Sequence, residues 1–100
     1  MSELNVMLHA PTPEALARAR RNARNLLKAR PDAQLLIIAN GAAVASALAQ
    51  PDPETDGLLR LCRNSLNAQN LDNTGGIAEV DAAVVTLAEL QNQGWAYIRT

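Results

Sequence analysis

The segment Gln34-Leu35-Leu36-Ile37-Ile38-Ala39-Asn40-Gly41 decides the fold class of this 100-residue chain. Residues 35–39 are apolar at every position rather than at alternate positions, which is typical of a strand that is buried on both faces of a parallel sheet. Asn40-Gly41 then ends the strand, because both residue types favour turns. A central parallel strand needs helices on both sides, so the segment predicts an α/β fold.

Strand and helix patterns alternate along the rest of the chain. The expected strands cover residues 4–10, 34–40, 58–62, 77–80 and 95–99. The expected helices cover residues 12–29, 42–49, 64–70 and 82–93, with Thr12 and Asp81 as N-caps and Gly94 as the residue that ends the last helix. Because connections between parallel strands are right-handed, this order predicts one domain, residues 1–100. We expect a three-layer α/β/α sandwich around a mostly parallel sheet of about five strands.

The composition favours neither a nucleic-acid partner nor a membrane. Nine Lys and Arg residues nearly balance ten Asp and Glu residues, and the formal net charge is -1. No electrostatic bias therefore attracts nucleic acid or an anionic membrane. Trp95 and Tyr97 are the only two residues of the Phe, Trp and Tyr class, so the chain lacks stacking surfaces for single strands. The longest apolar runs are too short to span a bilayer.

The compartment is predicted from the N-terminus and from cysteine usage. Met1-Ser2-Glu3 lacks the basic and apolar regions of an export signal. Cys62 is the only cysteine, so the chain forms no intramolecular disulfide and fits a reducing compartment. We therefore expect a cytoplasmic protein.

The helix expected at residues 12–29 concentrates positive charge. Six of the nine basic residues lie on it or directly after it: Arg18, Arg20, Arg21, Arg24, Lys28 and Arg30. They surround an apolar stripe that includes Leu16, Ala23 and Leu27. One interpretation is a surface for phosphate or for an acidic partner. The interpretation that we favour is a solvated face with cations near the helix C-terminus.

Cys62 is the best candidate for a functional residue. It lies where an apolar strand gives way to a helix start, which places its sulfur beside free backbone N–H groups that favour the thiolate. Arg60 and Arg63 flank it and would stabilise the anion, while Asn64 and Ser65 would donate hydrogen bonds near the sulfur. The alternative is that Cys62 only fills core volume, as free cysteines often do.

Other polar residues also fall at strand ends, where ligands bind in open parallel sheets. They are His9 and the Asn40-Gly41 pair. His9 is the only histidine, so it is either the base of a cysteine hydrolase or a hydrogen-bonded residue without a catalytic role. Cys62 and His9 together give at most two soft ligands, so we expect no metal site and no cofactor.

The missing second cysteine narrows the chemistry that Cys62 can perform. Thioredoxin-type exchange uses a resolving cysteine in a C-x-x-C motif, and this chain has none. A single thiol that carries sulfane sulfur as a persulfide needs no resolving partner.

Four segments resemble the DsrE/DsrF-like (YchN-like) sulfur-relay family. They are Leu61-Cys62-Arg63-Asn64-Ser65-Leu66 followed by Leu71, Leu90 to Ile98 with the sequence LQNQGWAYI, Asn22 to Leu27, and Asn40-Gly41. The resemblance implies a small α/β fold on a parallel sheet, assembly into homotrimers or hexamers, and a persulfide-carrying cysteine at Cys62. Asn40 in place of the family's histidine and Asn70 in place of its usual glycine are departures.

The sequence thus predicts a cytoplasmic sulfur carrier or sulfurtransferase-like protein, in which Cys62 takes sulfur from a donor protein and passes it to an acceptor. The alternative is a non-catalytic oligomeric module that binds an unknown ligand, with Cys62 as packing. A third hypothesis is the hydrolase, which requires the His9 ring within hydrogen-bond reach of Cys62. Self-association would bury more apolar surface on so small a domain, and Trp95 and Tyr97 either cover that interface or pack inside the subunit.

Overall fold

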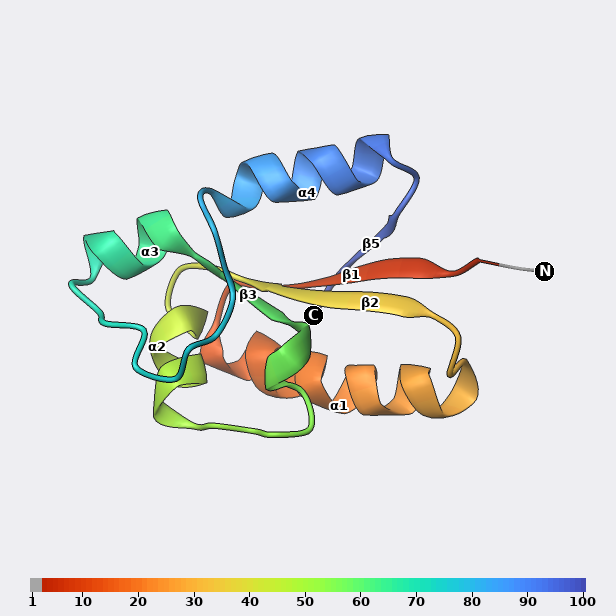
Figure 1. The fold of residues 1–100 in the computed structure, drawn as a ribbon, viewed down its shortest axis with the longest axis horizontal. Coiled ribbons are helices and arrows are strands. Elements are labelled where there is room, and N and C mark those ends of the chain that lie inside the picture. Colours follow the sequence, from red (N-terminus) through yellow and green to blue (C-terminus); the bar gives the residue numbers. More distant parts are fainter. Residues whose placement is uncertain (1–2) are drawn as a thin grey trace.

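The fold is a three-layer α/β/α sandwich around one parallel sheet, as the sequence predicts (Figure 1). The computed structural model describes residues 3–100, so Met1 and Ser2 of the N-terminal stretch considered above lie outside it. The strands are β1 (Asn5–Ala10), β2 (Gln34–Ala39), β3 (Leu59–Cys62), β4 (Glu79–Val80) and β5 (Ala96–Arg99), in the order β4-β3-β2-β1-β5.

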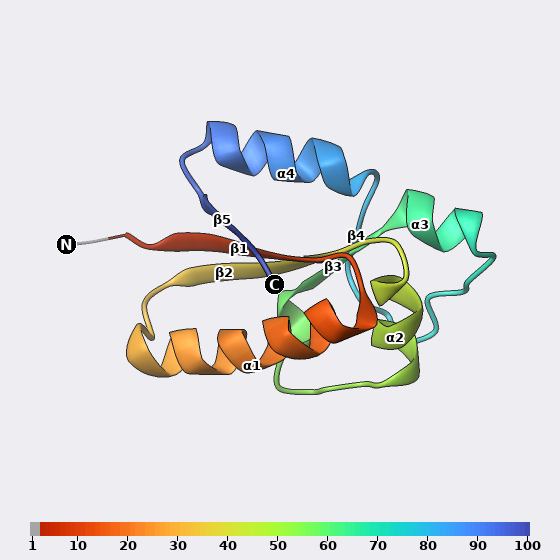
Figure 2. The ribbon, with the colours of Figure 1, turned by 180° about the vertical axis from the view of Figure 1, so that it is seen from behind.

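The helices divide unequally between the two faces of the sheet. Helices α1 (Pro13–Ala29) and α2 (Ala43–Ala49) cover one face, and α4 (Ala83–Asn92) alone covers the other (Figures 1 and 2). The short α3 (Arg63–Ala68) follows directly from the carboxyl end of β3, and a 3₁₀ turn, η1 (Asp56–Leu58), precedes that strand.

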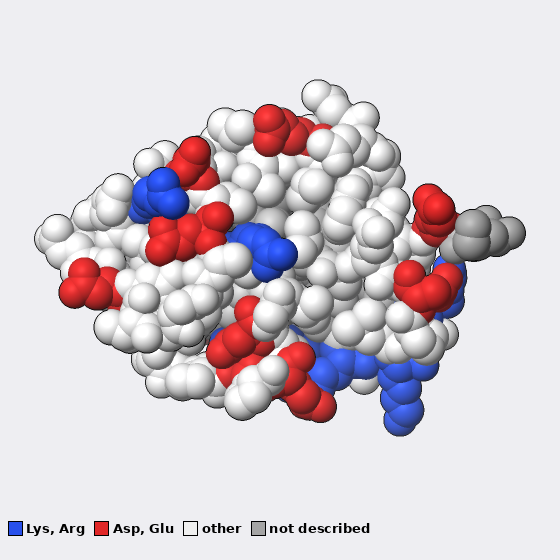
Figure 3. Space-filling model, in the orientation of Figure 1, with Lys and Arg blue, Asp and Glu red and all other residues white. Residues whose placement is uncertain are grey.

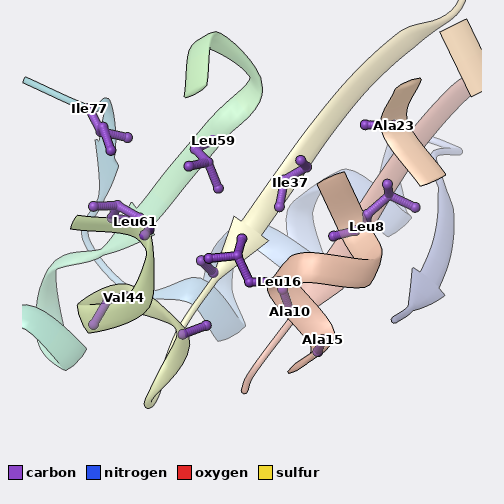
Figure 4. Close-up of a cluster of buried hydrophobic side chains, with 14 of the residues drawn as sticks. Leu8, Ala10, Ala15, Leu16, Ala23, Ile37, Val44, Leu59, Leu61 and Ile77 are labelled. Atoms are coloured by element: carbon purple, nitrogen blue, oxygen red, sulfur yellow. The ribbon is translucent and has the colours of Figure 1, made fainter. Parts of the chain in front are cut away.

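Strand β2 holds the two sides of the sheet together. It pairs with β1 on one side and with β3 on the other, and Ile37 lies between Leu8 and Leu59 in the register. The larger core lies under α1 and α2 and is built from aliphatic side chains (Figure 4). A smaller cluster lies under α4 and consists of Met7, Ile38, Cys62 and Ala83, with the partly buried Leu36, Leu87, Leu90 and Trp95 around it.

The two long helices begin differently from each other. Thr12 caps α1 as predicted, since its Oγ1 accepts the N–H of Ala15 at 3.0 Å. The expected cap of α4 is wrong, because Ala82 rather than Asp81 is the N-cap and makes no side-chain cap. The carboxylate of Asp81 instead pairs with Arg63 at 2.9 Å. Gly94 follows the helix with φ +90°, as expected for the residue that ends it.

Strand β4 is shorter than predicted. Residues 77–80 were expected to form it, but only Glu79–Val80 do. The side chain of Asn73 explains the difference, since its Nδ2 donates to the carbonyl of Ile77 and its Oδ1 accepts the N–H of Ile77 at 3.2 Å. With these backbone groups paired to a side chain, Ile77 packs into the core as part of a loop.

The basic residues of α1 are not a uniformly solvated face, so the interpretation that we favoured needs correction. Arg20 is buried, and its Nη2 lies 3.1 Å from Oδ1 of Asp56. Arg24 lies 2.8 Å from Asp52. These pairs fasten the loop at residues 50–57 to the helix, and Figure 3 shows acidic groups beside the basic groups along the lower edge of the molecule.

Removal of the Asp56 carboxylate should therefore destabilise the fold. The Arg20 side chain is only 8% exposed, so Asp56→Ala leaves a buried charge without its hydrogen-bonded partner, at a cost of about 2 kcal/mol. Urea unfolding followed by circular dichroism measures the change in the free energy of unfolding. Asp32→Ala is the matched control, because its pair with Arg30 is exposed. Equal losses in the two variants would contradict this account of the loop.

Candidate functional site

The strand order brings the predicted strand-end residues to neighbouring strands. His9 lies on β1, Asn40 directly follows β2, and Cys62 ends β3, and these three strands are adjacent. Side chains alternate between the faces of a sheet. His9 is two residues beyond Met7 and Asn40 is two residues beyond Ile38, so both share the α4 face with Cys62.

His9 connects two of these strands with β5. Its Nδ1 lies 2.6 Å from the hydroxyl of Tyr97, and its Nε2 lies 3.0 Å from Oδ1 of Asn40. We call His9, Asn40 and Tyr97 the polar row. Since an amide oxygen only accepts hydrogen bonds, Nε2 carries the proton and Nδ1 accepts from the Tyr97 hydroxyl in the neutral ring. The imidazole is therefore held in one tautomer and one orientation.

The Asn40-Gly41 turn links the polar row to α3. The N–H of Gly41 donates to Oγ of Ser65 at 2.9 Å, and Nε2 of Gln69 donates to the carbonyl of Gly41 at 2.9 Å. Gly41 has φ +56°, and a Cβ at this position would lie 3.1 Å from the carbonyl oxygen of Pro11. The turn thus requires glycine for both its conformation and its close approach to the neighbouring chain.

Cys62 is the N-cap residue of α3 and is only 5% exposed. Its sulfur accepts the N–H of Ala83, the first residue of α4, at 3.4 Å. The hydroxyl of Ser65 and the backbone N–H groups of Ser65 and Asn64 also lower the pKa of Cys62, although none of them makes a side-chain cap of α3 with the sulfur. Because Gly41 already donates to the Ser65 oxygen, the hydroxyl proton of Ser65 is free to point at the sulfur.

These donors determine the ionisation of the thiol. Burial by itself raises the pKa of Cys62, but the hydrogen bonds from Ser65, Ala83 and Asn64 outweigh it and lower the pKa below its ordinary value. The sulfur therefore lies in a pocket of donors at the first turns of two helices, although apolar side chains surround it.

The two arginines do not have the role that the sequence suggested. Arg63 donates to Glu79 at 3.0 Å and to Asp81 at 2.9 Å, and Arg60 donates to the carbonyls of Leu59 and Gly57. The hydrogen bonds that lower the pKa of Cys62 come from neutral donors instead. Asn64 contributes its backbone N–H.

The structure does not form the pair of His9 and Cys62 that the hydrolase hypothesis requires within the chain. Both ring nitrogens of His9 face other groups, the Tyr97 hydroxyl and the Asn40 amide oxygen, rather than the Cys62 sulfur. Over residues 3–100, no group of three or more His, Cys, Asp or Glu side chains is placed to hold a metal ion. Among the helices of this same range, none has the length and apolar character needed to cross a membrane.

Sequence reasoning missed two contributors to the site. Tyr97 was considered only for packing or for an interface, yet the register of β5 with β1 places it within reach of His9. The donor at Ala83 is a backbone group, so no residue type marks it. A known strand order would have identified Tyr97, whereas only the fold itself reveals Ala83.

Comparison with known proteins supports the fold and leaves the function open. No protein-family model and no curated protein matches the chain. The chain is similar to a solved structure described as "Structure of Protein of Unknown Function MTH1491 from Methanobacterium thermoautotrophicum", with a TM-score of 0.74, 22% sequence identity and 100% coverage of both chains. At this identity the similarity concerns the fold alone.

The ionisation of Cys62 can be tested by the pH dependence of its alkylation. We expect the pKa in the folded protein to lie below that of the unfolded chain and to rise in Ser65→Ala, with Ser46→Ala in α2 as the control. Since folding lowers this pKa, ionisation of Cys62 stabilises the fold above the unfolded-state pKa, and this contribution is lost as the pH falls through the folded-state pKa. An unchanged pKa in Ser65→Ala would contradict the assignment of its hydroxyl.

The polar row predicts the tautomer of His9. In ¹⁵N spectra of the neutral imidazole, we expect Nε2 to carry the proton and Nδ1 to be the acceptor. Tyr97→Phe removes the donor to Nδ1 while it preserves the ring, so the Nδ1 resonance should shift and the Nε2 proton should remain. A ring protonated at Nδ1 in the unmodified protein would contradict this hydrogen-bond pattern.

Proposed function

We propose that this protein is a cytoplasmic sulfur carrier that holds sulfane sulfur as a persulfide on Cys62. The observation that carries the proposal is the position of the only thiol of the chain, at the start of α3 with the Ala83 N–H 3.4 Å from its sulfur and with Ser65 and Asn64 as nearby donors. A thiolate is the nucleophile in sulfur exchange, and these donors lower the pKa of Cys62. The same donors would also stabilise the persulfide anion, which carries its charge on sulfur.

The transfer step needs no oxidant. The Cys62 thiolate attacks the outer sulfur of a donor persulfide, R–S–SH, and forms a new S–S bond. The S–S bond of the donor breaks, its electron pair leaves with R–S⁻, and Cys62 becomes Cys–S–SH with the proton that the outer sulfur carried. The reverse attack by an acceptor thiolate unloads the carrier. Electrons balance in both directions, so one cysteine suffices.

The residues around Cys62 then have separate roles. Ser65 and the N–H groups of Asn64 and Ala83 bind the anionic sulfur. Gly41 orients the Ser65 hydroxyl, and His9 fixes the Asn40 side chain beside that turn. The polar row thus positions the residues around Cys62. It does not act as the general base that a hydrolase would need.

The proposal includes assembly into a homotrimer or hexamer and contact with donor and acceptor proteins. Val84 and Val85 on α4 and Tyr97 and Ile98 on β5 are exposed hydrophobic side chains, and Tyr97 is 40% exposed. Apolar residues in such positions are typical of contact surfaces. Trp95 packs against the cluster under α4, so of the two aromatic residues Tyr97 is the one that we assign to the interface.

Incubation with a small persulfide donor, followed by intact mass measurement, tests the sulfur carrier directly. We expect a mass gain of one sulfur atom that a reductant reverses, and no such gain in Cys62→Ser. Ser65→Ala should retain less of the added sulfur, because the persulfide anion loses a hydrogen-bond donor. An unmodified protein, or the same gain in Cys62→Ser, would contradict the proposal.

The second candidate is a non-catalytic oligomeric module. The low exposure of Cys62, 5%, and its place in an apolar cluster favour it. The two functions differ in the behaviour of the native thiol, since a carrier must expose its sulfur at least transiently. A thiol that alkylates only on global unfolding would favour the binding module.

A further inference from the structure

The segment between β4 and α4 covers the Cys62 sulfur. Val80 lies beside Cys62 in the register of β3 and β4. The N–H of Ala83 donates to the sulfur at 3.4 Å, and Ala83 belongs to the same buried cluster as Cys62. We call residues 79–83, which comprise β4, the two linking residues and the first residue of α4, the strap. The strap is therefore in direct contact with the atom that a sulfur donor must reach.

One arginine fastens the strap to the start of α3. Arg63, the residue after Cys62, donates through Nε to Glu79 at 3.0 Å and through Nη1 to Asp81 at 2.9 Å. Figure 3 shows a basic group among acidic groups where α3 and the start of α4 approach each other. A second contact comes from Asn73, whose Nδ2 donates to Glu79 at 3.0 Å. These bonds connect the strap to α3 and to the loop that follows it.

The fastening is exposed. The side chains of Arg63 and Asp81 are 53% and 88% exposed, and ion pairs in such positions contribute little to stability. The outer side of the strap borders an open groove of about 540 Å³ that Val80, Asp81, Val85 and Glu89 help to line. No side-chain cap holds the start of α4. The strap therefore has room on its outer side. Its pairing with β3, the burial of Ala83 and the ion pairs of Arg63 together hold it in place.

We infer that the strap is a gate over Cys62 and that Arg63 is its latch. In the closed position Cys62 is 5% exposed. Exchange requires the attacking sulfur, the outer sulfur and the leaving sulfur to lie nearly in line, and the contact between Ala83 and Cys62 occupies part of that space. The strap must move outward before a donor reaches the sulfur. The claim that a sulfur donor enters through the gate rests on the proposed function. The claim that the strap controls access to Cys62 does not.

The gate predicts how the latch controls access to the thiol. Cys62 is allowed to react with an uncharged aromatic disulfide, and the rate is compared in the wild-type protein, Arg63→Gln, Asp81→Asn and Glu79→Gln. Loss of one exposed ion pair is worth up to about a fivefold change in an equilibrium, so we expect each latch variant to react about two to five times faster. Glu89→Gln is the matched control, because it removes a carboxylate that lines the same groove.

The pair of variants at Arg63 and Asp81 separates the gate from simple electrostatics. Arg63→Gln removes a positive charge near the thiolate and Asp81→Asn removes a negative charge, so an effect on thiol ionisation alone has opposite signs in the two. Release of the latch instead accelerates the reaction of Cys62 in both variants. We also expect the double variant to react no faster than Arg63→Gln, since one ion pair cannot be broken twice.

Rates that move in opposite directions, or rates that equal that of Glu89→Gln, would overturn the gate. Asp81→Asn changes an exposed side chain and keeps the fold intact, so its result decides the matter even where Arg63→Gln disturbs α3. Faster labelling together with no persulfide formation would leave the gate in place and contradict the sulfur carrier. Persulfide formation with unchanged labelling rates would support the sulfur carrier and contradict the gate.

Discussion

The hydrogen bonds to the Cys62 sulfur are the interaction on which the site depends. Cys62 ends β3 and occupies the N-cap position of α3, and its sulfur accepts the N–H of Ala83, the first residue of α4, so one residue joins three elements. Burial of a thiolate is unfavourable unless its charge is satisfied by donors. Ser65, Asn64 and Ala83 supply them, and the pKa of Cys62 falls although the residue is buried. The position of α4 and the chemistry of the thiol are therefore linked.

The parallel sheet makes this arrangement possible. Because neighbouring strands end at the same edge, the order β3-β2-β1-β5 sets Cys62, the Asn40-Gly41 turn, His9 and Tyr97 side by side. The turn is linked to the thiol through Ser65, since Gly41 donates to Ser65 and the Ser65 hydroxyl lowers the pKa of Cys62. The unequal covering of the sheet matters as well. With only α4 on its face of the sheet, the site stays near the surface, and a short strap separates it from solvent.

Much of the fold could be predicted from the sequence, because burial on both faces leaves a clear pattern. The apolar run at residues 35–39 identified the central strand, and Thr12-Pro13 identified the start of α1. The N-cap of α4 and the length of β4 could not be predicted, since Asp81 and Asn73 find tertiary partners that local patterns do not reveal. The candidate site was likewise predictable only in part. Cys62 was visible as a residue, whereas the Ala83 donor and the latch at Arg63 depend on segments distant in sequence.

The central claim is that the donors around Cys62 hold a sulfur-bearing anion. A crystal structure of the protein loaded with a persulfide donor tests it most directly. The account predicts electron density for a second sulfur bonded to Sγ of Cys62, hydrogen bonds from Ser65 or Ala83 to the anionic sulfur, and residues 79–83 displaced outward from their position in Figure 1. An added sulfur that points into solvent without these donors, or a loaded protein whose Cys62 carries no second sulfur, would contradict it.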